Sequence, residues 1–268
     1  MSTRRARGQR RSGATPAATL RRSALLARLA AVVTAVIAWW LVCDVLARDD
    51  AVLGRMGPGP TTAALWDLLH QRSTAVNAAA SLRRLLLGLL LAAVAGIPLG
   101  LLLGSRRLLE HASAPLIAVL RTTSPLAWAP LAIVLLGVGD APVVALVALA
   151  AIWPMTLTTA HAVRGLDPAA LQVVRSLGAS RIEALGTVVV PALRPHVLAA
   201  LRLALGIGWV VLVPAEMLGV DSGLGYAVLN ARDQLDYPQL AATIVLIGAT
   251  GFLLDRLLQP PAPTGDGP

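Results

Sequence analysis

The 268-residue sequence has no lysine, a single cysteine, and few aromatic or acidic residues. The lone Cys43 excludes a disulfide framework and a cysteine metal cluster. A P-loop needs a lysine to reach nucleotide phosphates, so the chain cannot hydrolyse ATP alone. Only 14% of its residues are charged and 56% are apolar, whereas soluble domains average roughly 25% and 45–50%. This balance excludes an ordinary soluble globule and favours a lipid bilayer as the solvent.

Six apolar segments of about 20 residues predict six transmembrane helices. They cover residues 25–47, 85–104, 115–139, 141–163, 196–219 and 238–258. An amphipathic helix is expected near residues 61–80, between the first and second spans. The predicted fold is therefore an all-α polytopic membrane protein, with a membrane domain over residues 24–258 and a flexible C-terminal tail over 259–268.

The 23 basic residues are all arginines, and they are unevenly distributed. With the N-terminus inside, the inner segments carry more arginine than the outer ones, which predicts that both termini are cytoplasmic. Residues 1–23 are expected to form a disordered basic tail. Because no aromatic residue precedes Trp39, this tail is not expected to stack on nucleic-acid bases. A cleaved signal peptide is the alternative interpretation of this start, but the later spans favour a retained anchor.

The segment 165–195 is too long and too patterned for a simple connector. Asp167 can cap a first short helix that begins at Pro168, and Gly178 ends it. Ser180 and Glu183 form the ends of a capping box that starts a second helix. Pro191 is expected to close that helix. The segment therefore predicts two short helices around a glycine turn.

An apolar face on the first of these helices, with Arg175 and Arg181 beside it, suits docking into a groove on another protein. This face comprises Leu171, Val174 and Leu177. A loop that lies on the membrane surface is the equal alternative from the pattern alone.

The same segment resembles the EAA loop of ABC-importer permeases, in which a Glu-Ala-Ala motif is followed by a glycine and, further on, by Ile-x-Leu-Pro. Here Gln172-Val173-Val174 stands for Glu-Ala-Ala, and Gly178 is followed by Pro191 after the family interval. The resemblance implies that the segment couples to an ATPase. The coupling residues it implies are Gln172, Val173, Val174, Arg175, Leu177, Gly178, Ala179, Ser180, Arg181, Glu183 and Pro191.

Residues 81–258 resemble the permeases for nitrate, sulfonate, taurine and bicarbonate, chiefly in SLRRLLLGLLLAAVAGIPLGLLLG, SPLAWAPLAIVLLGVGD, SLGASR and PAEMLGVDSGLGY. The resemblance implies a type I ABC importer permease in a bacterial plasma membrane that moves a small oxyanion inward. It implies separate ABC ATPase subunits that hold ATP and Mg, a periplasmic or lipid-anchored solute-binding protein, and a second permease copy. The chain itself is expected to bind no cofactor. Membrane lipid is expected to surround its helices.

Ionisable residues inside the spans are candidates for a solute path, because burying charge in a bilayer costs at least a few kcal/mol. Arg202 could line the path, or it could pair with another helix or with a lipid headgroup. Glu216 suits a gate or helix packing, and Arg121 could snorkel to the surface. Hydroxyls near Pro125 could line the path or bond to carbonyls of the preceding turn. The candidate path residues are Thr122, Thr123, Ser124, Trp128, Arg202, Trp209 and Glu216.

Two other classes of function are weaker. Ser222 superficially suggests a serine nucleophile of an intramembrane protease, but no histidine is expected beside it to act as the general base. A receptor or a structural membrane protein remains an alternative, and it would need no ATPase partner.

Gly96, Gly100 and Gly104 lie four residues apart and predict a close helix–helix contact within the chain.

Overall fold

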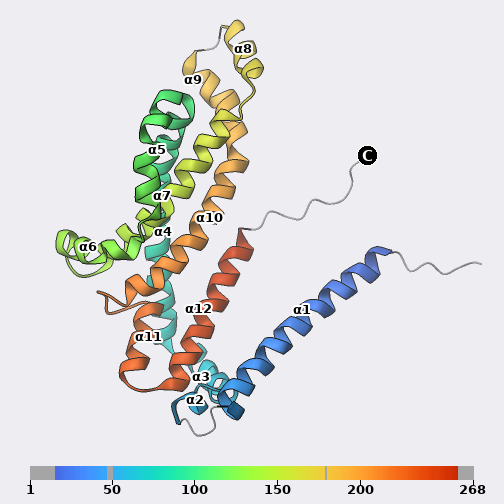
Figure 1. The fold of residues 1–268 in the computed structure, drawn as a ribbon, viewed down its shortest axis with the longest axis vertical. Coiled ribbons are helices and arrows are strands. Elements are labelled where there is room, and N and C mark those ends of the chain that lie inside the picture. The colour runs from blue at the N-terminus through green and yellow to red at the C-terminus, as the bar shows by residue number, and fades with distance from the viewer. Residues whose placement is uncertain (1–15, 47–50, 179, 259–268) are drawn as a thin grey trace, which may run out of the picture. The chain divides into compact units, whose positions relative to one another are not determined.

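The computed structural model describes residues 16–46, 51–178 and 180–258, and every regular element in these ranges is helical (Figure 1). The chain comprises two compact units, residues 1–62 and 63–268. The predicted tails lie largely outside the described residues, although helix α1 already begins at Pro16.

The first unit contains α1 (Pro16–Trp40), a π-helical turn (Leu41–Leu46) and α2 (Ala51–Arg55). The indole of Trp39 donates a hydrogen bond to the carbonyl of Met56 at 3.1 Å, which ties the end of α1 to the segment after α2. The sole cysteine, Cys43, is buried. Helix α3 (Pro58–His70) contributes residues to both units.

The second unit is a helical bundle. Its elements are α4 (Arg72–Ser105), α5 (Arg107–Thr122), a 3₁₀ turn (Pro125–Trp128), α6 (Ala129–Leu136), α7 (Asp140–Arg164), α8 (Pro168–Ser176), α9 (Arg181–Ala184), a π-helical turn (Leu185–Val189), α10 (Val190–Glu216), α11 (Leu224–Asp233) and α12 (Tyr237–Leu257). The loop end, with α8 and α9, lies opposite the end that holds α11 (Figure 1).

Helix α7 is the centre of the core, because it packs against both α4 and α10. Leu85, Val147, Met155 and Leu212 have no exposed surface and belong to one continuous apolar cluster. The predicted glycine face on α4 is confirmed: a Cβ placed on Gly100 would lie 2.6 Å from the carbonyl oxygen of Thr156 on α7. Glycine therefore permits a backbone approach that a larger residue would prevent.

The six-span prediction is not confirmed. Among the residues that the structure describes, four helices are long and apolar enough to cross a membrane, namely α4, α7, the run Ile182–Glu216 and α12. A fifth crossing is possible if α5 and α6 count as one bent span, and the first predicted span corresponds to a shorter apolar helix, Leu29–Val45. The expected helix over residues 61–80 is divided between α3 and the start of α4.

The third predicted span is broken rather than continuous. Helix α5 and the segment Pro125–Leu136 meet at an angle of 84°. The break falls at Thr123 and Ser124, directly before Pro125, where proline disfavours helical geometry in the residue that precedes it. The chain therefore turns sharply between α5 and the following segment and does not continue as one straight helix.

Candidate functional site

The predicted two-helix loop is present at one end of the second unit (Figure 1). The side chain of Asp167 accepts a hydrogen bond from the backbone N–H of Ala169 at 2.9 Å and so caps α8. The capping box is also confirmed: the N–H of Ser180 donates to Glu183 at 2.7 Å, and the N–H of Glu183 donates to Ser180 Oγ at 3.3 Å.

The loop presents apolar side chains to its surroundings. Leu177 is 81% exposed and Ile182 is 82% exposed, and Val173 is also exposed. Gln172 is exposed and Val174 is partly buried. Ala179 and the side chains of Leu171, Arg175 and Arg181 lie outside the described residues. An exposed apolar surface at a helix-turn-helix is typical of a docking surface for a partner.

The expectation for Pro191 is wrong. The second loop helix does not end there: it continues through the π-helical turn into α10, and Pro191 lies in the first turn of that helix. Proline lacks the N–H that would bond to the turn before it, which fits a local departure from α-helical bonding at Leu185–Val189. Loop and core helix therefore form one continuous helical run, Ile182–Glu216.

Replacing Gly178 with valine is expected to abolish uptake while the chain still inserts into the membrane. Gly178 has φ +83° and open space around its Cα, so the effect arises from backbone strain, about 1–2 kcal/mol for a side chain in this region. The measurement is solute uptake relative to the amount of chain in the membrane. Gly186→Val is the matched control, since Gly186 also has open space but no positive φ; normal uptake by Gly178→Val would contradict the prediction.

The hydroxyl groups at the break are occupied by backbone carbonyls. Thr122 Oγ1 donates to the carbonyls of Ala118 and Val119, both at 3.0 Å, and Thr123 Oγ1 donates to Val119 at 3.0 Å. These bonds match the alternative in which hydroxyls ease the turn before a proline. Ser124 is exposed, and Trp128 in the 3₁₀ turn is 37% exposed.

Among the path candidates on α10, Trp209 and Arg202 have partners within the chain. Trp209 is buried and would meet a Cβ placed on Gly251 of α12, so it packs between helices. Arg202 forms a two-pronged ion pair with Asp255 of α12, with Nε to Oδ1 at 2.9 Å and Nη2 to Oδ2 at 3.0 Å. This is the interhelical pairing that the sequence analysis gave as an alternative to lining the path and to binding a lipid headgroup.

Arg202→Ala is expected to reduce transport without weakening ATPase association, because the Arg202–Asp255 pair lies on α10 and α12, away from the loop helices. The measurement is uptake together with the yield, per copy of this chain, of the co-purified ATPase that the resemblance implies. Arg202→Lys, which keeps the charge but not the two-pronged geometry, is the companion variant. Full transport by Arg202→Ala would assign this residue a structural role only.

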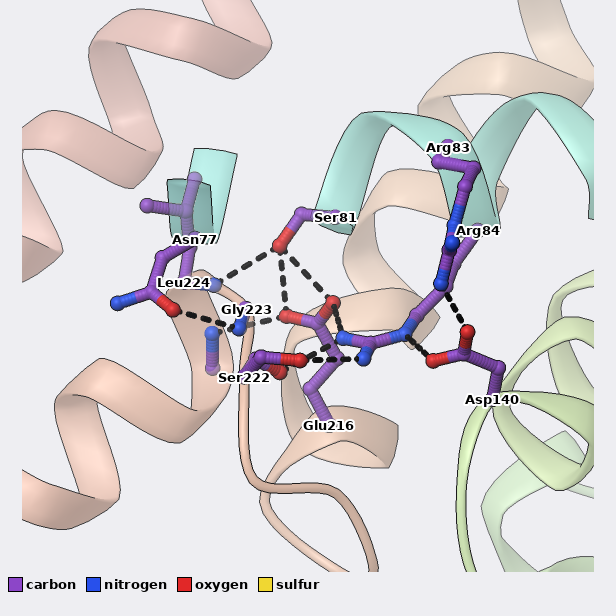
Figure 2. A network of polar contacts seen from close by, with 10 residues as sticks. Asn77, Ser81, Arg83, Arg84, Asp140, Glu216, Ser222, Gly223 and Leu224 are labelled. Atoms are coloured by element: carbon purple, nitrogen blue, oxygen red, sulfur yellow. Dashed lines mark hydrogen bonds and ion pairs between the residues drawn. The ribbon is translucent and has the colours of Figure 1, made fainter. Parts of the chain in front are cut away.

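Glu216, the third candidate on α10, belongs to a buried polar network at the opposite end of the unit from the loop (Figure 2). Its main partner is Arg84 of α4, which is 1% exposed. Arg84 Nη1 donates to Glu216 Oε1 at 2.8 Å, and Nε donates to Asp140 Oδ1 at 2.6 Å. Nη1 and Nη2 also donate to the carbonyl and hydroxyl oxygens of Ser222 at 2.7 and 2.8 Å. Arg83 forms a further ion pair with Asp140 on the exposed side.

The same network satisfies the first backbone N–H groups of α11, which have no partner within their own helix. Ser81 Oγ donates to both carboxylate oxygens of Glu216, at 2.9 and 2.8 Å. The acceptors at the start of α11 all come from α4 or α10 (Figure 2): Asn77 Oδ1 for Gly223 N–H at 3.0 Å, Ser81 Oγ for Leu224 N–H at 2.8 Å, and Glu216 Oε2 for Gly225 N–H at 2.9 Å.

Glycine is required where α11 begins. Gly223 has φ +112°, and a Cβ there would overlap the carboxylate of Glu216. The turn can therefore lie directly against the buried charge, and the positive end of the α11 dipole points at a carboxylate, which is a favourable arrangement. The network thus fastens the turn between α10 and α11 to α4 and α7.

Sequence reasoning missed most of this network. The second predicted span began at residue 85 and left Arg84 just outside it, and Asn77, Ser81 and Asp140 were not singled out. The available signal was the pair of arginines beside an uncharged span, together with an acidic residue at the start of the next helix. Ser222 is held by Arg84, and a guanidinium cannot act as a general base, so this geometry gives no support to a serine protease.

A helical bundle with several helices long and apolar enough to cross a membrane is the architecture of a multi-pass membrane protein. The profile of the family described as "Binding-protein-dependent transport system inner membrane component" matches residues 96–260. The chain belongs to this family and is an ABC importer permease of the nitrate and taurine type.

Several curated relatives agree. A probable ABC transporter permease protein of Brucella melitensis is 37% identical over 67% of this chain and 73% of its own length. The taurine transport system permease protein TauC of Escherichia coli is 32% identical over 81% of this chain and 80% of its own length. The nitrate import permease protein NrtB of Leptolyngbya laminosa is 34% identical over 67% of this chain and 64% of its own length.

The fold is also similar to a solved structure, a chain of the MetNI methionine ABC transporter in an inward-facing conformation. The TM-score is 0.53 with 17% sequence identity, and the alignment covers 68% of this chain and 94% of that one. This likeness concerns the fold, which is that of an ABC importer permease.

Proposed function

We propose that this chain is the permease subunit of an ATP-driven importer that moves a small oxyanion, nitrate or an aliphatic sulfonate such as taurine, into the cytoplasm. The observation that carries the proposal is the family membership together with relatives whose names specify nitrate import and taurine transport. Another small solute of the same family is the second candidate, because a separate binding protein selects the solute in such systems.

The loop end supports the proposed coupling to an ATPase. Exposed apolar side chains of Leu177 and Ile182 offer a surface that a groove on a partner would bury. ATP and Mg are held by the separate ATPase subunits in this proposal, and the loop of this chain transmits their closure. Since arginine is concentrated in the segments at this end, the loop end is proposed to be cytoplasmic, with both termini on the same side.

The opposite end, with α11, is proposed to face the solute-binding protein, which is periplasmic or lipid-anchored. A second copy of this chain is proposed to complete the pore, in keeping with the second permease copy that the resemblance implies. Closure of two ATPase subunits on ATP would then shift both copies between two discrete arrangements, as coupling between distant sites requires a two-state element.

The experiment is to tag the full chain in its native host, extract it in mild detergent, and determine which proteins co-purify and in what ratio. The expected result is two permease copies with two P-loop ATPase subunits. The accompanying binding protein is then titrated with nitrate, taurine and alkanesulfonates, and one of them is expected to bind. A chain that emerges alone, under conditions that preserve known transporters, would contradict the ATP-driven mechanism, whereas a binding protein that takes none of these oxyanions would contradict the substrate class.

A further inference from the structure

A cavity of about 250 Å³ lies between α5 and the last turns of α7. Its polar lining consists of Arg121, Glu110 and Ser113 from α5 and His161 and Arg164 from α7. Glu110 and Arg164 form an ion pair, and Arg164 Nη2 lies 2.9 Å from His161 Nδ1. The lining thus contains one carboxylate and two guanidinium groups, so its formal charge is positive even when the histidine is neutral.

Arg121 is the cation that this pairing leaves available. Within the residues that the structure describes, its side chain forms no hydrogen bond or ion pair. By contrast, Arg84 and Arg202, two arginines on other membrane-spanning helices, are both held by carboxylates. A cation without a partner inside a membrane span marks a functional position by default, because it costs free energy that pairing would reduce.

Arg121 lies at the far end of α5 from its start. It follows Arg107, the first residue of α5, by fourteen residues in the sequence, which corresponds to about 21 Å along the helix axis. It stands one residue before the end of α5, at the 84° break. In secondary transporters, breaks in membrane helices are where polar groups gather around a solute.

The hydroxyl groups at this break are less suited than Arg121 to binding an anionic solute. Those of Thr122 and Thr123 already donate to backbone carbonyls, and each hydroxyl has only one proton to donate. A guanidinium offers five donors in a planar fork and binds an oxyanion through two of them. Arg121 is therefore the group at the break best suited to an anion.

We propose that this cavity, which we call the Arg121 cavity, is a subsite for the oxyanion of the transported solute, with Arg121 as its anchor. The proposal rests on the proposed function, since it names the group that receives the anion on its way through the permease. The phosphate of a lipid headgroup shares this chemistry, so the test must separate a free solute from a lipid.

The first arm of the test measures uptake of ¹⁵N-nitrate and of ¹⁴C-taurine by cells whose only copy of the permease carries a variant. Solute is supplied at saturating concentration, so that the binding protein does not limit the rate. Arg121→Gln is expected to lower the maximal rate about tenfold, the loss of one charged hydrogen bond, and Arg121→Lys to restore much of it. Arg107→Gln, on the same helix but outside the cavity lining, is expected to match the wild type.

The second arm reports occupancy of the cavity itself. The full chain in phosphatidylcholine vesicles is treated with the arginine reagent phenylglyoxal, and modification of Arg121 and Arg107 is followed separately by mass spectrometry. Nitrate or ethanesulfonate is expected to protect Arg121 and not Arg107. The same labelling is repeated in vesicles that contain phosphatidylglycerol.

Each outcome decides the proposal. Protection by free oxyanion in phosphatidylcholine, together with slow transport by Arg121→Gln, supports it. Protection that requires phosphatidylglycerol and does not respond to nitrate or ethanesulfonate assigns the cavity to a lipid and overturns it, as does wild-type transport by Arg121→Gln. If the wild type takes up neither probe, the proposed substrate class fails, and the labelling then shows independently whether the cavity binds an oxyanion.

Discussion

Arg84→Met is expected to destabilise the permease severely, by about 3–5 kcal/mol, because it leaves a buried carboxylate without its cation. Glu216 has no exposed surface, and Arg84 is its only ion-pair partner in the part of the chain that is described. The variant also removes the donors to Ser222. The measurement is the apparent melting temperature of the detergent-extracted chain, together with the amount of folded chain in the membrane.

Arg83→Met is the matched control. Arg83 precedes Arg84 on the same helix and also pairs with Asp140, but its side chain is 61% exposed. Exposed ion pairs contribute about 1 kcal/mol or less, so little change is expected.

The double variant Arg84→Met with Glu216→Gln distinguishes the cost of an unpaired buried charge from the cost of altered packing. It removes both buried charges, and glutamine can still accept the hydrogen bond from the N–H of Gly225. It is therefore expected to be more stable than Arg84→Met alone. Equal stability of Arg84→Met and Arg83→Met would show that the network does not hold the turn before α11.

Gly100→Ala is expected to lower the melting temperature by separating α4 from α7. The added Cβ would lie 2.6 Å from the backbone oxygen of Thr156 and from Cβ of Thr159, and backbone cannot move aside as a flexible side chain can. Overpacking of this kind costs about 1–3 kcal/mol, which corresponds to roughly 2–10 °C for a chain of this size. Valine at the same position is expected to have the larger effect.

Gly248→Ala on α12 controls for helix propensity. Gly248 also lies within a helix, but its added Cβ meets nothing within 4 Å. Alanine favours the helix by up to about 1 kcal/mol over glycine, so this variant is expected to be as stable as the wild type or slightly more stable. If Gly100→Ala and Gly248→Ala had the same melting temperature, the close contact at Gly100 would contribute nothing to stability.

The sequence predicted the features that depend on local pattern. Apolar length identified α4, α7, α10 and α12, the spacing of Gly96, Gly100 and Gly104 identified the α4 contact face, and the capping residues located α8 and α9. Each of these signals lies within one or two helical turns, where periodicity and capping chemistry are decisive. The continuation of the helix through Pro191 escaped prediction, because proline both ends helices and begins them.

The polar network could not be predicted, since its partners are far apart in sequence. Arg84 is separated by 132 positions from Glu216 and by 138 from Ser222. No local pattern distinguishes an arginine buried by such partners from one in a loop, and the predicted span begins only at residue 85. The homologous family gave the class of protein, but only the packing of α4 against α7 and α10 brings these charges together.

The unbroken run Ile182–Glu216 has a mechanical consequence. Its 35 residues correspond to about 52 Å of helix, and they begin in the exposed loop and end at a carboxylate of the polar network. A stiff helical rod transmits displacement along its axis, but this one contains the π-helical turn Leu185–Val189 and the interior prolines Pro195 and Pro214, which are places where helices bend. The stiffness of this helical run, including its π-helical turn, would then determine how much of a displacement at the loop end reaches the end at Glu216.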